Sequence, residues 1–122
     1  MWFPSTGVLK YGPGIKAALA VDQSISDLYR WFVPKHIDLN PQRYPAHVSV
    51  VRREKPNMDF WRKHEGRKIN FEYSNEIIWD ETYYWLNVRC PVIEEIRAEL
   101  GLTPYPWWVN SFHVTIGNVK AL

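Results

Sequence analysis

Two short motifs in this sequence of 122 residues could carry acid–base chemistry. One is His47-Val-Ser49-Val and the other is His113-Val-Thr115-Ile, so in each a histidine precedes a hydroxyl residue by two positions. Side chains two positions apart on a β-strand point to the same side, which places each histidine beside its hydroxyl. For this composition, two such matches among four histidines are about a one-in-several-hundred accident. We therefore expect the two motifs to form one catalytic site.

Two imidazoles and two hydroxyls suit the cleavage of a phosphodiester. Free imidazole titrates near pH ~6.5, so one ring can be neutral while the other is charged. The neutral ring removes a proton from the attacking hydroxyl or water, and the charged ring protonates the leaving oxygen. Ser49 and Thr115 can donate hydrogen bonds to the non-bridging oxygens as charge builds there. The sequence leaves open which histidine is the base.

This scheme needs no metal and no other cofactor. The four histidines also lack the nearby Cys, Asp or Glu partners that the spacing of a zinc site would supply. We therefore expect a metal-independent enzyme.

The same order of elements leads to each motif. Residues 16–22 are typical of a buried strand, and residues 24–33 have the apolar spacing of a helix that Pro34 closes. A proline-rich loop then leads to the alternating strand that begins at His47.

The second motif follows an equivalent series, 66 positions later. Residues 83–89 are typical of a strand, and residues 91–100 carry an apolar stripe that Gly101 ends. Residues 69–79 supply further strand material before this series. The repeat predicts two pseudo-symmetric lobes, 15–56 and 69–120, within one domain of residues 1–122.

Several residues are candidates for contacts with the substrate. Trp85 and Asn87 should line the site, because Leu86 and Val88, which alternate with them, should face the helix. Tyr11, Trp107 and Trp108 could stack on a nucleobase, since flat aromatic rings are good platforms for bases. Each of these three is equally compatible with a role in packing.

The composition excludes some classes of partner. The net charge is +2 and no basic run exceeds two residues, which argues against affinity through coating a nucleic-acid backbone. A nucleotide or a short RNA needs only a few charges and remains compatible. Cys90 is the only cysteine and no apolar stretch reaches membrane-spanning length, so we expect a cytoplasmic protein without intrachain disulfides. The oligomeric state stays open.

The paired motifs resemble the His-x-Ser/Thr signatures of the 2H phosphoesterase superfamily. That superfamily includes LigT-like RNA ligase/cyclic phosphodiesterases, 2′–5′ oligoadenylate phosphodiesterases and phage enzymes that degrade cyclic nucleotide immune signals. The resemblance covers nearly the whole chain, residues 16–120. It implies an α+β (two-layer α/β) fold in which two lobes of antiparallel strands, with outer helices, surround a central cleft.

The resemblance also implies an activity: cleavage of cyclic nucleotides, 2′,3′-cyclic phosphates or 2′–5′ linkages by the two histidines. The short spacing between the motifs favours a small nucleotide as substrate. One alternative is a catalytically silent module of the same fold that binds nucleotides or RNA. Another is a structural protein whose aromatic residues form an interface with a partner.

Overall fold

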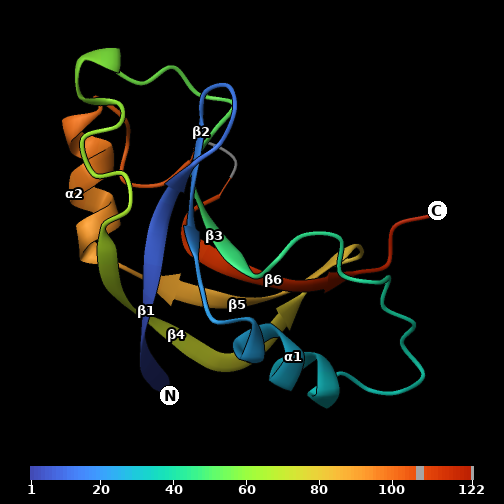
Figure 1. Ribbon diagram of the computed structural model, residues 1–122. Helices are drawn as coiled ribbons and strands as arrows, with labels where there is room; N and C mark the ends of the chain where they lie inside the picture. Colours follow the sequence, from blue (N-terminus) through green and yellow to red (C-terminus); the bar gives the residue numbers. More distant parts are fainter. Residues whose placement is uncertain (107–108, 122) are drawn as a thin grey trace.

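The computed structural model describes residues 1–106 and 109–121, and its strands form a closed antiparallel barrel (Figure 1). Around the barrel the strands follow the order β1-β2-β3-β6-β5-β4, and β4 pairs again with β1. The strands are β1 Trp2–Tyr11, β2 Lys16–Ala20, β3 His47–Arg52, β4 Lys68–Trp79, β5 Tyr83–Arg89 and β6 Phe112–Asn118. The helices are α1 Gln23–Phe32 and α2 Pro91–Glu99, with a single 3-10 turn at Met58–Phe60.

The barrel corrects the expected fold class. The expected α+β fold, with two layers around a central cleft, is wrong: six strands close on themselves and the two α-helices are short. The first strand makes the difference, because β1 pairs with β2 on one side and with β4 on the other. Pro4 and Gly7 are both disfavoured inside strands, so the local pattern did not predict β1.

Both residues fit β1 for local reasons. Pro4 lies opposite Glu72 on β4, in the part of β1 that precedes its first partner on β2, Val8. The missing N–H of proline therefore costs no bond to β2. At Gly7 a Cβ atom would stand 2.6 Å from Cγ of Leu19, so the close approach of β1 to β2 leaves no room for a side chain.

The order of elements repeats along the chain, with one more strand in each half than the expected series. Each half of the chain has the order strand, strand, helix, strand, so that β1, β2 and β3 correspond to β4, β5 and β6. The barrel order is symmetric under this exchange. Strand β5 spans the predicted residues, and Gly101 follows α2 with a φ of +74°, the left-handed conformation that ends a helix.

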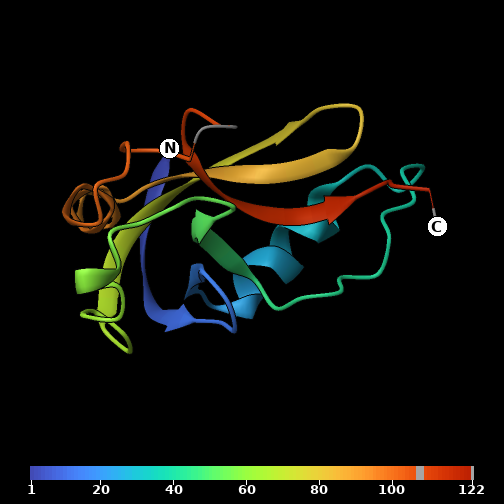
Figure 2. The ribbon, with the colours of Figure 1, turned by 90° about the horizontal axis from the view of Figure 1, so that it is seen from above.

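Apolar side chains of the strands fill the barrel. Leu19, Val48, Leu86 and Val114 come from four different strands and are completely buried. Helix α1 packs against β6, and α2 packs against β3 and β4. The two helices are well separated in Figure 1, with α1 at the lower right and α2 at the upper left. Figure 2 shows the same separation from above. Within the described residues, no helix combines the length and apolar character needed to cross a membrane.

Candidate active site

The two motifs lie on neighbouring strands. Strands β3 and β6 pair in antiparallel fashion with Val48 opposite Val114, and both valines point into the barrel. The residues on either side of each valine must then point outward on the same surface. This surface carries the half-buried side chains of His47, Ser49, His113 and Thr115 and is called the histidine face below.

The antiparallel register places the histidine of each motif opposite the hydroxyl residue of the other. Antiparallel pairing about the two valines sets His47 opposite Thr115 and Ser49 opposite His113. Cβ atoms directly opposite each other are about 5 Å apart, and diagonal neighbours such as the two histidines about 7–8 Å. Each histidine is thus flanked by its own hydroxyl along the strand and by the other motif's hydroxyl across the strands.

Residues directly opposite each other form two rows across the histidine face, one through His47 and Thr115 and one through Ser49 and His113. Strands β2 and β5 continue both rows. Ala20 lies opposite His47 and Ala18 opposite Ser49 on β2, while Trp85 and Asn87 lie opposite the second motif on β5. The histidine face is therefore bordered by small side chains on one side and by larger ones on the other.

The His47 ring is oriented by the backbone. Its Nδ1 atom lies 2.8 Å from the carbonyl oxygen of Pro45. A carbonyl can only accept a hydrogen bond, so Nδ1 carries the proton and donates it. In the neutral ring the other nitrogen, Nε2, is then the one with a free lone pair.

The environment of His113 favours the neutral ring. Burial lowers the pKa of His113 below its usual 6.5, and the positive charge of His47 lowers it further. A hydrogen bond with the backbone of Ser111 opposes these two effects. The two imidazoles are diagonal neighbours on the histidine face, so a charge on one disfavours a charge on the other.

A short polar network borders His113. The rings of Trp85 and His113 meet edge-on, with centroids 6.3 Å apart. Trp85 Nε1 donates to Asn87 Oδ1 at 3.2 Å, and Ser111 Oγ lies 3.5 Å from the same oxygen. Trp85 and Asn87, which the sequence predicted as substrate contacts, thus lie beside the second motif.

The other predicted contacts fall elsewhere. Tyr11 lies opposite the buried Ala17 and packs edge-on against Trp61 with ring centroids 4.9 Å apart, so the structure places it away from the histidine face. Trp107 and Trp108 lie outside the described residues.

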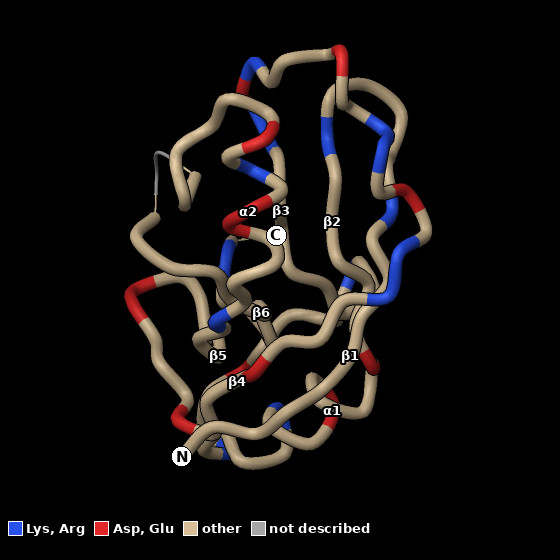
Figure 3. The backbone as a smooth tube through the Cα atoms, turned by 90° about the vertical axis from the view of Figure 1, so that its left-hand side faces the viewer, with Lys and Arg blue, Asp and Glu red and all other residues tan. Residues whose placement is uncertain are grey.

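Basic side chains border the histidine face on the β1–β2 side. Lys10 lies opposite Ala18 and thus extends the row of Ser49, and Lys16 lies directly opposite Arg52. Figure 3 shows Lys and Arg gathered on the side where β1 and β2 lie. Sequence analysis missed Lys10 because it missed β1, although the alternation of Leu9, Lys10 and Tyr11 was a signal for a strand.

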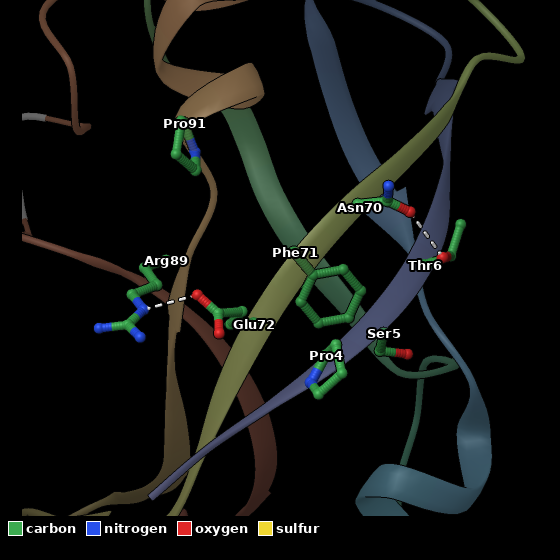
Figure 4. Close-up of a pocket in the computed structure, with 8 residues that line it drawn as sticks. All are labelled: Pro4, Ser5, Thr6, Asn70, Phe71, Glu72, Arg89 and Pro91. Atoms are coloured by element: carbon green, nitrogen blue, oxygen red, sulfur yellow. Dashed lines mark hydrogen bonds and ion pairs between the residues drawn. The ribbon is translucent and has the colours of Figure 1, made fainter.

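A separate depression of about 560 Å³ lies on another wall of the barrel, between β1, β4 and the start of α2 (Figure 4). Its charged groups are already paired, since Arg89 Nε donates to Glu72 Oε1 at 2.9 Å. Its polar residues Thr6 and Asn70 also bond to each other. This depression offers no unpaired titratable group, so the histidine face is the better candidate for catalysis.

Comparisons with known proteins leave the site to be interpreted from its own geometry. No protein-family model matches the chain, and no curated protein or solved structure matches it. Within residues 1–106 and 109–121, no group of three or more His, Cys, Asp or Glu side chains is arranged to hold a metal ion.

Proposed function

We propose that this protein is a phosphodiesterase that uses His47 and His113 for metal-independent acid–base catalysis. Its substrates are nucleotides with a cyclic phosphate, a 2′,3′-cyclic end or a 2′–5′ linkage. The observation that carries the proposal is the crossed register, which sets each motif histidine beside the hydroxyl of the other motif. Two proton-transfer groups and two hydrogen-bond donors then share one surface of the barrel.

The lowered pKa of His113 suits it to the role of base. Neutral His113 takes the proton of the attacking hydroxyl or water as that oxygen bonds to phosphorus. His47, protonated at both ring nitrogens, gives the Nε2 proton to the leaving oxygen as its bond to phosphorus breaks. One proton is taken up and one is released, so the reaction needs no other co-reactant than the attacking group.

The hydroxyl groups of Ser49 and Thr115 stabilise the negative charge that develops on the non-bridging oxygens of the phosphate. They stand in different rows of the histidine face, one beside each histidine. Each donates one hydrogen bond to a non-bridging oxygen. Nearby Lys10 and Arg52 attract the anionic substrate over a longer range.

Membership of the 2H phosphoesterase superfamily is part of this proposal. It is supported by the two motifs and by their placement on one surface, and not by the fold class expected from the resemblance. A silent binding module would have no use for two titratable rings that lie this close together.

A panel of nucleotides incubated with the protein in EDTA tests the function. We expect chromatography to show cleavage of at least one cyclic or 2′-linked substrate by the wild type and not by His113→Ala. His64→Ala is a matched control, because His64 pairs with Glu99. Binding of the substrates without turnover would instead support the silent module, and cleavage that requires an added metal would contradict the mechanism.

A further inference from the structure

Two β-bulges occupy equivalent places in the two halves of the chain. The β2–β3 register skips Val50, and the β5–β6 register skips Ile116. Each of these extra residues stands three positions after a motif histidine. A bulge bends its strand and takes backbone groups of the extra residue out of the ladder, so each motif ends at a bend.

Each bulge carbonyl accepts a hydrogen bond from an arginine of the opposite half. Arg97 on α2 donates from Nη1 to the carbonyl of Val50 at 2.6 Å. Arg30 on α1 donates from Nη1 to the carbonyl of Ile116 at 2.7 Å. Both arginines lie in the last turn of their helix. The two backbone acceptors that the bulges free are thereby satisfied.

The same arginines also hold the loop of their own half. Arg30 Nη2 donates to the carbonyl of Asn40 at 3.2 Å, in the loop that leads to His47. Arg97 Nε donates to the carbonyl of Thr103 at 2.8 Å, in the loop that leads to the second motif. Each guanidinium therefore ties the loop before one histidine to the bulge after the other.

We propose that Arg30 and Arg97 are positioning residues that fix the two motif histidines relative to each other. The proposal rests on the proposed function for its catalytic consequence, but the placement of the rings can be measured without any substrate. The planar guanidinium donates in several fixed directions at once, which a lysine at the same place cannot do.

The two arginines differ in what their removal leaves behind. Arg97 is fully buried and also forms two hydrogen bonds to the carboxylate of Glu54, whose side chain is nearly buried. Without Arg97, the carboxylate of Glu54 would be buried without its ion-pair partner, which would destabilise the whole fold. Arg30 is half-buried, and within the described residues its side chain makes hydrogen bonds to carbonyl groups alone, so it is the better residue for the test.

The experiment compares Arg30→Gln and Arg30→Lys with the wild type. Arg62→Gln serves as the control, because Arg62 pairs with Glu65 on an exposed segment. NMR titration gives the pKa of His113 in each protein with His47 present and with His47→Gln, and the difference reports the interaction between the two rings. We expect this difference to shrink in Arg30→Gln, to be partly kept in Arg30→Lys and to be unchanged in the control.

Turnover gives the second readout. A displacement of the histidines by about 1 Å should lower kcat on the order of 10²-fold with little change in KM. An unchanged ring interaction and an unchanged kcat in a folded Arg30→Gln protein would overturn the proposal. Loss of the fold in both Arg30 variants would also overturn it, since Arg30 would then determine stability. If the ring interaction shrinks but no nucleotide is cleaved even by the wild type, only the proposed function fails.

Discussion

The ring of Trp85 meets the ring of His113 edge-on, with centroids 6.3 Å apart and planes at 60°. This contact covers one side of an imidazole whose pKa is lowered mainly by burial. The indole therefore helps to keep the proposed base neutral.

Replacing Trp85 tests that relationship. Trp85→Ala admits water to His113, so we expect its pKa to rise towards the usual 6.5. Trp85→Phe retains most of the cover and should leave the pKa closer to that of the wild type. NMR titration of the imidazole measures both, and equal values in the wild type and Trp85→Ala would show that the indole plays no part.

The lowered pKa of His113 also predicts how stability depends on pH. Between the folded-state pKa and the unfolded value near 6.5, the unfolded chain binds more protons than the folded one. The free energy of unfolding should therefore fall as the pH drops below about 6.5 and be fully restored above it. Urea unfolding between pH 5 and pH 8, roughly one and a half units either side of the usual histidine value, checks this. His113→Gln should weaken the dependence, and an identical slope in the variant would contradict the assignment.

The four motif residues should divide the chemistry unequally. His47→Ala and His113→Ala should each lower turnover by roughly 10²–10⁴-fold, the usual value of a positioned acid or base. The double variant should be little worse than either single one, because both protons move in one displacement. Ser49→Ala and Thr115→Ala should cost less, since each removes one of several hydrogen bonds to the phosphate. Single-turnover rates decide this, and a histidine variant with near wild-type turnover would refute the mechanism.

Lys10 should contribute to substrate capture rather than to chemistry. Lys10→Met keeps the aliphatic stem and removes the charge, so KM should rise while kcat changes little. The dependence of kcat/KM on salt concentration should weaken, because salt screens the long-range attraction that the substitution removes. Lys63→Met is the control, because Lys63 is paired with Glu99. An equal effect of the two substitutions would mean that only net charge matters.

The close contact between β1 and β2 predicts the effect of a single methyl group. At Gly7 a Cβ atom would stand 2.6 Å from Leu19 Cγ and 2.8 Å from the carbonyl oxygen of Ala20. Gly7→Ala should therefore lower the free energy of unfolding by about 1–3 kcal/mol, the range for overpacked sites. Gly66→Ala tests a different cause, since that position has free space but a φ of +80°. Wild-type stability of Gly7→Ala would show that β1 moves aside.

The local residue pattern predicted how the two motifs are oriented on their strands, but it did not predict that the strands close into a barrel. The alternation around His47 and His113 predicted which side chains share a face, because period-2 spacing is a property of the strand itself. The bulges at Val50 and Ile116 break that period only after the motifs, so they left the prediction intact.

Closure of the barrel depends on contacts that local pattern does not contain. Strand β1 joins β2 to β4 through pairings such as Val8 with Lys68, sixty positions away in the sequence. The hydrogen bonds of Arg30 and Arg97 likewise join segments that are far apart in the sequence. The local pattern around each arginine therefore does not indicate them. The basic residue Lys10 was missed for the same reason.

Arg30 and Arg97 each donate a hydrogen bond to a carbonyl of the other half of the chain, so neither half is complete by itself. One strand-strand-helix-strand unit by itself would leave its bulge carbonyl without a donor and its guanidinium without that acceptor. Two separate copies, facing each other about a two-fold axis, would satisfy both needs at once. Within one chain, each half therefore supplies the donor that the other half needs.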